Sequence, residues 1–156
     1  ERADGERADG RAPRAAQRAR EAEAAAQAQS IADRLAKYKR VHVRVSIKGA
    51  SEDEFHTLTG ARRDAYELPY QALKHLISRG VSCNACLMAS FSDLDGVKSV
   101  YKRLAAIAPG ILSSLEIERI KQFPKVRARL KKYGLTANRG VSCAPADLIA
   151  TDRGAI

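Results

Sequence analysis

The stretch VHVRVSIKG, residues 41–49, carries a polar side chain at every second position: His42, Arg44, Ser46 and Lys48. Three valines and an isoleucine stand between them. This alternation, rich in β-branched residues, predicts a strand, because successive side chains of a strand point to opposite faces. One face then presents an imidazole, a guanidinium, a hydroxyl and an ammonium, which together can bind anions and donate hydrogen bonds. The row is either solvated surface or the lining of a binding site.

Two cysteines form a second group that could do chemistry. Cys83 and Cys86 have the CxxC spacing of zinc sites and redox pairs. They fall inside a predicted strand over residues 81–91, where a separation of three places two side chains on opposite faces. We therefore expect no shared metal: Cys83 packs against helices, and Cys86 lies on the same face as Asn84. The chain has three cysteines, an odd number that indicates free thiols in a reducing compartment.

The elements that must position these groups are helices and strands that alternate along the sequence. Ser51 and Glu54 form a capping box for a short helix that ends at Gly60. Ser92 with Asp95 predicts the start of another helix. The remaining predicted elements are a helix ending near residue 38, a helix over 66–80, strands over 81–91 and 113–120, and a last helix beginning at Pro124.

Strand–helix–strand connections of this kind predict parallel strands with helices packed outside them. The valine face of residues 41–49 must meet those helices, so the polar row faces elsewhere. A sheet covered on both sides would be apolar on both faces, and the row therefore favours a partial barrel with a polar interior. Ser46 and Lys48 lie at the C-terminal strand end, where barrel enzymes carry their catalytic groups, and His42 lies at the other end in a structural role. Arg44 contacts a substrate or pairs with Glu116 or Glu118, because a buried arginine needs a carboxylate.

The 156 residues suffice for one domain. Residues 1–30, in which ERADG occurs twice, are of low complexity and are predicted to be disordered to helical. Residues 31–135 form the globular unit, and 136–156 a poorly defined tail. No apolar run approaches the roughly 20 residues that cross a bilayer, and the first residues lack the apolar stretch of a signal peptide. We expect a cytoplasmic protein without a membrane partner.

The formal net charge is +10, and seven basic residues between 119 and 132 have no acid among them. Such a run either tracks the phosphates of a nucleic acid or forms the solvated face of a helix. Only Phe123 and Tyr133 flank the run, whereas aromatic residues are interleaved with the charges in many single-strand binders. The solvated face is favoured, and a basic nucleic-acid-binding α/β module stays as the alternative function.

The segment VRVSIKGASEDEFHTLTGA, followed by a helix and a strand that leads to SFSD, resembles the second half of a radical S-adenosylmethionine enzyme. The similarity is nearest to the branch of the pyruvate formate-lyase activating enzymes and extends from about Ile31 to Leu135. It implies a partial (β/α) barrel that binds a 4Fe-4S cluster and S-adenosylmethionine at the C-terminal strand ends. It also implies reductive cleavage of S-adenosylmethionine to a radical that takes hydrogen from a substrate.

The resemblance also implies roles for individual residues. Lys48 matches a lysine that contacts S-adenosylmethionine, and its ammonium could pair with the methionyl carboxylate. Ser46 stands where relatives carry an acidic residue, and Asn84 falls near a position that is polar or basic in them. Arg44 and Cys86 would face the substrate cavity. The chain lacks the CxxxCxxC motif that ligates the cluster and a GGE-type segment, so we expect part of an enzyme that is inactive alone.

Overall fold

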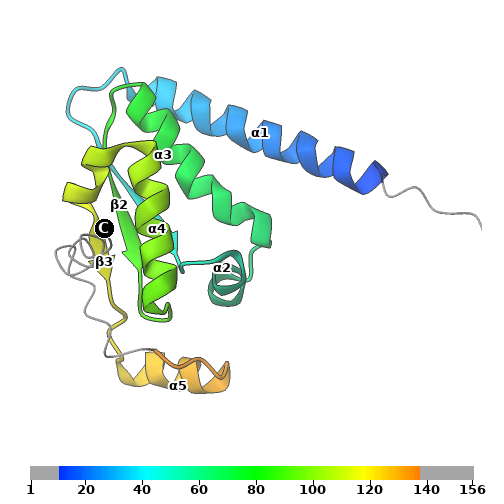
Figure 1. The fold of residues 1–156 in the computed structure, drawn as a ribbon, viewed down its shortest axis with the longest axis vertical. Helices are drawn as coiled ribbons and strands as arrows, with labels where there is room; N and C mark the ends of the chain where they lie inside the picture. Colours follow the sequence, from blue (N-terminus) through cyan, green and yellow to red (C-terminus); the bar gives the residue numbers. More distant parts are fainter. Residues whose placement is uncertain (1–10, 138–156) are drawn as a thin grey trace, which may run out of the picture.

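The computed structural model describes residues 11–137. The predicted segment 1–30 lies partly, and the tail 136–156 mostly, outside the described residues. The structure has five α-helices and three strands in the described part, joined in places by short 3₁₀ helices (Figure 1). In chain order these are α1 (Arg11–Leu35), β1 (His42–Lys48), α2 (Glu52–Thr59), η1 (Arg63–Glu67), α3 (Leu68–Ser78), β2 (Ser82–Met88), α4 (Leu94–Ile107), η2 (Pro109–Ser114), β3 (Glu116–Glu118) and α5 (Pro124–Lys132).

The three strands form one open parallel sheet in the order β1-β2-β3. In the register, Ser46 stands opposite Cys86 on β2, and Lys48 stands opposite Met88. Met88 in turn stands opposite Glu118 on β3. The prediction of a mixed α/β fold with parallel strands joined through helices is therefore confirmed.

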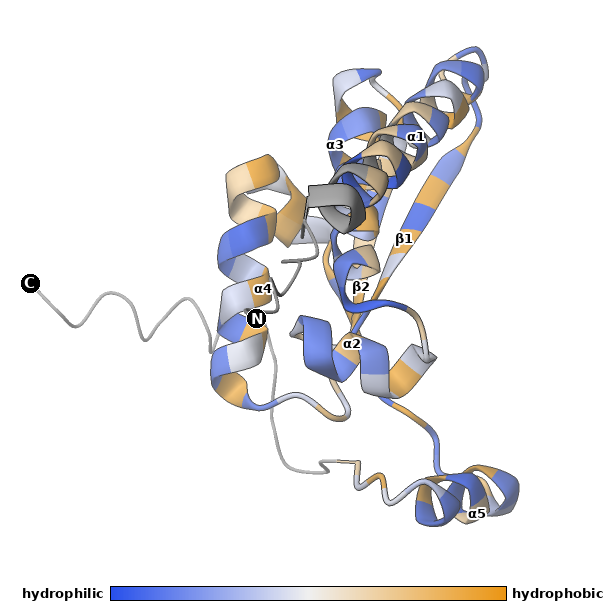
Figure 2. Ribbon diagram, turned by 90° about the vertical axis from the view of Figure 1, so that its right-hand side faces the viewer, coloured by the Kyte–Doolittle hydropathy of each residue, from blue (hydrophilic) through white to orange (hydrophobic). Residues whose placement is uncertain are grey.

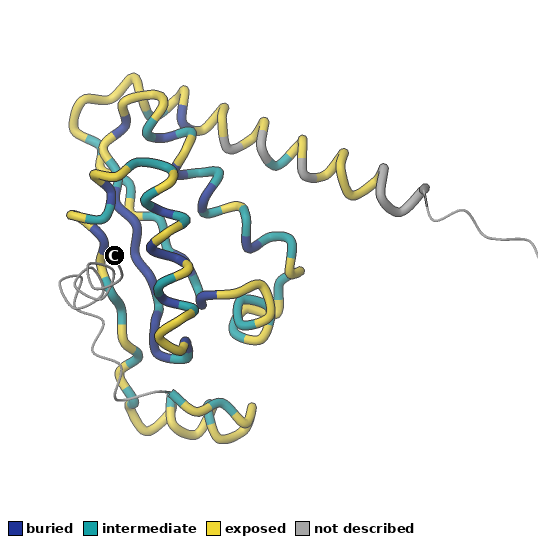
Figure 3. Tube along the Cα trace, in the orientation of Figure 1, coloured by how far each residue is buried: buried dark blue, intermediate teal, exposed yellow. Residues whose placement is uncertain are grey.

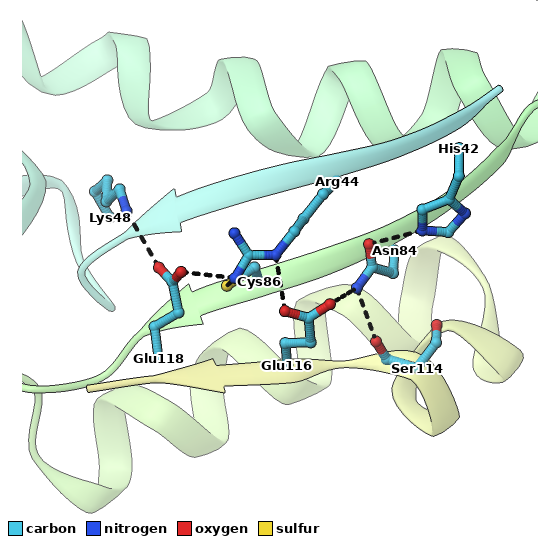
Figure 4. A network of polar contacts seen from close by, with 8 residues as sticks. All are labelled: His42, Arg44, Lys48, Asn84, Cys86, Ser114, Glu116 and Glu118. Carbon is cyan, nitrogen blue, oxygen red and sulfur yellow. Dashed lines mark hydrogen bonds and ion pairs between the residues drawn. The ribbon is translucent and has the colours of Figure 1, made fainter. Parts of the chain in front are cut away.

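The hydrophobic core lies between the sheet and helices α3 and α4. Ile47 of β1 and Leu87 of β2 are fully buried there, together with Leu73 of α3 and Leu104 of α4. Each such side chain contributes about 1.5–3 kcal/mol relative to an exposed one. Both helices lie on the same side of the sheet, behind the strands in Figure 4. In Figure 2 the colours of β1 alternate between hydrophilic and hydrophobic along the strand, as expected for a strand with one side packed against this core.

Both caps of α2 are those predicted from the sequence, whereas the N-cap of α4 differs from the predicted residue. Ser51 accepts a hydrogen bond from the Glu54 amide at 3.2 Å, and α2 ends at Gly60 with a φ of 72°. The cap of α4 is Asp93 and not Ser92, because the Asp93 carboxylate accepts from the Gly96 amide at 2.7 Å. Ser92 is one residue too early to reach that turn, and its hydroxyl bonds elsewhere.

The second and third strands are shorter than the sequence predicts. Strand β2 spans Ser82–Met88 where residues 81–91 are predicted, and β3 spans only Glu116–Glu118 where 113–120 are predicted. The chain before β3 winds into η2 from Pro109, which buries Ile111 in the core. After β3 the chain has no strand left to pair with, because β2 has already ended.

The two ends of the described chain leave the body of the protein. Helix α1 contacts it near its C-terminal end, where buried Ala32 packs with Leu76 and Val81, and its earlier turns extend beyond α3 (Figures 1 and 3). Helix α5 stands apart at the opposite end and buries none of its residues. Among the helices that the structure describes, none combines the length and apolar character that a membrane span requires.

Candidate functional site

The candidate site is the side of the sheet turned away from α3 and α4, here called the polar face (Figure 4). It presents side chains from all three strands at matching register positions. Its members are His42, Arg44, Ser46 and Lys48 of β1, Asn84, Cys86 and Met88 of β2, and Glu116 and Glu118 of β3. The residues predicted as cofactor or cavity contacts, Arg44, Ser46, Lys48, Asn84 and Cys86, therefore all lie on this one face.

Charges on the polar face are separated by strand: cations on β1, neutral side chains on β2 and carboxylates on β3. Arg44 reaches across β2 and bonds Glu116 Oε2 through Nε at 2.7 Å and Glu118 Oε1 through Nη2 at 2.6 Å. The predicted pairing of Arg44 with Glu116 or Glu118 is thus confirmed, and it involves both. Since one guanidinium joins two carboxylates, Arg44 connects β1 to β3 although the two strands are not neighbours.

Lys48 also reaches across β2, but its ion pair is looser. Its Nζ lies 3.4 Å from Glu118 Oε2, the longest ion pair on this face. The Lys48 side chain is 40% exposed and that of Glu118 28%. An exposed pair of this kind contributes only about 0–1 kcal/mol, so a ligand carboxylate can replace Glu118 as the partner of Lys48 at small cost.

The N-terminal end of the polar face is occupied by a closed hydrogen-bond network. The carboxamide oxygen of Asn84 bonds His42 Nε2 at 3.1 Å, and its amide nitrogen donates to Glu116 at 2.6 Å and to the Ser114 carbonyl at 3.3 Å. His42 Nδ1 bonds the Ser82 hydroxyl at 2.8 Å. These contacts agree with the structural role predicted for His42. Asn84, a predicted cofactor contact, stands opposite Arg44 in the register, four residues before Met88, and both polar atoms of its side chain are already bonded.

Ser46 occupies the middle of the polar face, between Arg44 and Lys48 on β1. Its hydroxyl oxygen is buried and has no hydrogen-bond partner among the described residues. A buried hydroxyl left unpaired costs about 1–3 kcal/mol. The position is therefore one at which a polar ligand atom would recover a missing hydrogen bond.

Cys86 lies under the charged side chains and is fully buried. Its Sγ is 2.9 Å from Arg44 Nη2. Burial, reinforced by the negative charge of Glu118, raises the pKa of the Cys86 thiol to about 11. The thiol therefore stays protonated at neutral pH and is a poor nucleophile and metal ligand.

Cys83 lies on the other side of β2 and packs against the core, so the two cysteines face opposite ways as the alternation predicts. Both are free thiols. Within residues 11–137 no group of three or more His, Cys, Asp or Glu side chains could hold a metal ion.

The carboxylates of the polar face are ionised at neutral pH. Hydrogen bonds from Asn84 and Arg44 lower the pKa of Glu116, and a hydrogen bond from Arg44 lowers that of Glu118. Conversely, the two carboxylates raise the pKa of Arg44. With Lys48 included, two positive charges balance two negative ones across β2.

Glu54 connects the two loops that follow β1 and β2 at the C-terminal edge of the sheet. This contact was not predicted from the sequence. Glu54 accepts from the Ala50 amide at 3.1 Å and from the Ser92 hydroxyl at 2.7 Å, which joins the loop after β1 to the loop after β2. A side chain at Gly49, whose φ is 86°, would meet Glu54 at 2.9 Å. The capping-box motif predicted Glu54 only as part of a helix start, because no local pattern indicates Ser92 as a partner.

The basic run is not part of the polar face. The basic residues of α5 are exposed on a helix that stands away from the sheet (Figure 1). The structure therefore separates the two candidate functions in space, and variants at one site can be tested without disturbing the other.

The residues of the polar face fit the methionyl part of S-adenosylmethionine better than they fit a cluster. Lys48 supplies a loosely paired ammonium and Ser46 an unpaired hydroxyl near it. An iron–sulfur cluster needs several thiolates converging on one point. Cys83 and Cys86 face opposite sides of the sheet, and Cys143 lies outside the described residues, so the described cysteines do not fit a cluster.

No protein-family model, no curated protein and no solved structure matches this chain.

Proposed function

We propose that the chain is the C-terminal part of a radical S-adenosylmethionine enzyme, and that the polar face belongs to the interior of a partial (β/α) barrel. One observation carries the proposal. In the described residues the helices that flank the parallel strands lie on one side of the sheet, and the other side presents charged and polar groups in register. Barrels of this type have helices outside and functional groups inside, at the C-terminal strand ends.

Within this proposal, Lys48 binds the methionyl carboxylate of S-adenosylmethionine, and Ser46 donates or accepts a hydrogen bond beside it. Lys48 suits this role because its ion pair with Glu118 is long, at 3.4 Å, and both side chains are partly exposed. Asn84 contributes less directly, by holding Glu116 in place. Arg44 and Cys86 line the substrate side of the cavity, where the doubly paired guanidinium gives the wall a fixed shape.

A 4Fe-4S cluster would supply one-electron chemistry, and its ligands would come from a CxxxCxxC segment that is absent from this chain. What the chain itself does is bind and orient S-adenosylmethionine and form one wall of the cavity. Two of its three cysteines are free, buried or half-buried thiols, which supports the cytoplasmic location that the sequence predicts.

Binding of S-adenosylmethionine to the purified chain tests this proposal. We expect weak binding in an NMR titration, with shifts in the amide signals of residues 44–48. Lys48→Ala should weaken it by about tenfold, the loss of one charge-assisted bond. The matched control is Lys98→Ala, which removes an exposed lysine of α4 paired with Asp95 at 3.6 Å. Equal effects of the two substitutions would contradict the assignment of Lys48.

A second measurement addresses the missing cluster ligands. The chain alone, treated anaerobically with iron and sulfide and then reduced with dithionite, should show no signal of a reduced 4Fe-4S cluster in electron paramagnetic resonance. The DNA upstream of the codon for Ile31, or a partner protein, should encode a CxxxCxxC segment. A cluster assembled by this chain alone, with cleavage of S-adenosylmethionine, would show that the chain is not the partial enzyme proposed.

The second candidate function is nucleic-acid binding through residues 119–132. It is favoured by the isolation of α5, whose basic side chains are exposed away from the sheet. Binding to a labelled nucleic acid should weaken steeply with salt, because phosphate contacts release counterions. Reversing Lys125, Arg129 and Lys132 to glutamate should abolish it, whereas Lys48→Ala should leave it unchanged. Salt-independent binding would exclude this function.

A further inference from the structure

An open groove lies between helix α5 and the turn that follows it, where α5 stands apart from the sheet (Figure 1). Its volume is about 380 Å³, which is in the range of small-molecule binding sites. The groove shares no residue with the polar face. Its lining combines leucines, cations, a carboxamide and a hydroxyl, from Gln122, Arg127, Leu130, Lys131, Leu135 and Thr136.

The turn after α5 closes one side of this groove. Gly134 has a φ of 62°, the left-handed conformation in which many helices end. Its amide donates to the Lys131 carbonyl at 3.2 Å, and the Leu135 amide donates to the Leu130 carbonyl at 2.9 Å. This pair of hydrogen bonds forms a Schellman motif, which brings the residue after the glycine back beside the last turn of the helix. Leu130 and Leu135, both partly buried, therefore form an apolar floor.

The basic residues of α5 form two sets. Arg127 and Lys131 are four residues apart, on one side of the helix, and line the groove. Lys125, Arg129 and Lys132 do not line it. Helix α5 contains no acidic residue that could pair with either set. Only the first set thus places positive charge beside an apolar surface.

We propose that the groove holds one unpaired nucleotide of a single-stranded nucleic acid, with its base against Leu130 and Leu135 and its phosphate at Arg127 and Lys131. The inference rests on the second candidate function, nucleic-acid binding through residues 119–132. It adds which form of nucleic acid is bound and which residues of the basic run distinguish it.

A nucleotide suits this groove because it joins a flat ring with polar edges to an anion. The faces and edges of a base are accessible in a single strand, where they can pack on side chains and form hydrogen bonds. Gln122 and Thr136 bring an amide and a hydroxyl to the groove, and both groups can bond the edge of a base. A duplex keeps its bases stacked, so it offers the groove only phosphates.

Two exposed aromatic rings at the ends of α5 favour the same ligand. Phe123 precedes the helix and is 63% exposed, and Tyr133 follows it and is 68% exposed. Neighbouring bases of a single strand can stack on such rings. Binding to an anionic membrane would instead need a continuous apolar face. The larger apolar residues between the rings, Val126 and Leu130, are partly buried, which interrupts such a face.

The experiment measures binding of the whole chain to three labelled probes: a single-stranded oligothymidylate, a duplex of the same length, and an abasic oligodeoxynucleotide that keeps the phosphates without bases. The oligothymidylate should bind at least about tenfold more tightly than the abasic strand, which cannot fill the groove. Equal affinity for these two strands would overturn the nucleotide site.

Two double variants with the same loss of charge locate the site on the helix. Arg127→Gln with Lys131→Gln removes the cations of the groove, whereas Lys125→Gln with Arg129→Gln is the matched control outside it. The first pair should weaken oligothymidylate binding about tenfold more than the control pair does. Both pairs should weaken duplex binding equally, because the duplex responds to charge alone. Equal losses for oligothymidylate would overturn the site.

Leu135→Ala tests the apolar floor without a change in charge. It should weaken oligothymidylate binding about fivefold and leave duplex binding unchanged. Because α5 buries none of its residues, thermal unfolding of the variant should match that of the parent. Parental affinity for oligothymidylate would overturn the apolar floor. If the NMR amide signals show that α5 frays in this variant, the two double variants, which keep the Schellman turn, decide the question.

The outcomes separate this inference from nucleic-acid binding as such. If all three probes bind with a steep salt dependence and the two double variants are equivalent, the groove is overturned and nucleic-acid binding stands. If no oligonucleotide binds, both are overturned. Binding to vesicles that contain phosphatidylserine, without binding to any oligonucleotide, would likewise overturn both and assign α5 to a membrane surface.

Discussion

The two faces of the three-stranded sheet belong to the same strands but are held by different interactions: apolar packing on one face and ion pairs on the other. On the face toward α3 and α4, side chains such as Ile47 and Leu87 exclude water completely. On the polar face, Arg44 and Lys48 cross from β1 to the carboxylates of β3 through ion pairs that remain partly exposed. The first arrangement supplies most of the stability, and the second leaves groups that can exchange partners, as a binding site requires.

Neighbouring residues on β2 allow the strongest test of this division. Leu87→Ala opens a cavity in the core and should lower the free energy of unfolding by about 2–5 kcal/mol. Met88→Ala, one residue along on the polar face, should cost much less, because Met88 is only partly buried. Urea denaturation of both variants measures the difference. Equal losses would mean that the polar face is packed as tightly as the core.

Arg44→Met tests how far the ion pairs stabilise the fold. Because the Arg44 side chain is 44% exposed, we expect only a small loss in the free energy of unfolding, well below that for Leu87→Ala. The same variant should raise the pKa of both Glu116 and Glu118, since each loses a hydrogen bond from the guanidinium. Carboxyl NMR signals followed through a pH titration report these pKa values. Unchanged values would contradict the double pairing.

The polar face should also make stability depend on pH. The pKa values of Glu116 and Glu118 are lowered in the folded chain, so their contribution is present above the unfolded value of about 4.3. It is lost as the pH falls from that value through the lower folded values, because in this range the unfolded chain binds more protons than the folded chain, and protonation then favours unfolding. The melting temperature should therefore fall on acidification below about pH 4, and less so in Arg44→Met. Parallel melting curves of the two proteins against pH would exclude this contribution.

The smallest expected difference in stability is between two cysteine-to-serine substitutions, one on each face of the sheet. Cys83→Ser places a hydroxyl against the core and should cost about 1 kcal/mol, whereas Cys86→Ser places it beside Arg44 and should cost less. Thermal unfolding of the two variants measures the difference. A greater loss for Cys86→Ser would show that burial of the thiol matters more than the polar surroundings.

Local patterns predicted a large part of the fold and the composition of the site. The alternation in residues 41–49 predicted which parity faces the helices, and the separation of Cys83 and Cys86 predicted their opposite faces. The capping box at Ser51 predicted the start of α2. Each of these depends on residues within a few positions of one another, where the geometry of helix and strand determines direction.

Other features could not be predicted because they depend on which neighbour a segment meets. The short β3 follows from the end of β2, and the bond from Ser92 to Glu54 follows from the meeting of two loops. Asn84 was predicted as a cofactor contact, and the register places it opposite Arg44 and not in the row of Lys48. The polar side chain of Asn84 suggested this role, but which residue of β1 lies opposite Asn84 depends on the register between the two strands.

The sequence by itself determined that one strand carries an imidazole, a guanidinium, a hydroxyl and an ammonium on a single face, because a period of two leaves no other arrangement. Only the tertiary structure decided what those groups meet. Lys48 and Glu118 are 70 residues apart in the chain and become neighbours through the parallel pairing of β1, β2 and β3. That pairing is set by burial of the opposite face against α3 and α4, since a slip of one residue would exchange the two faces.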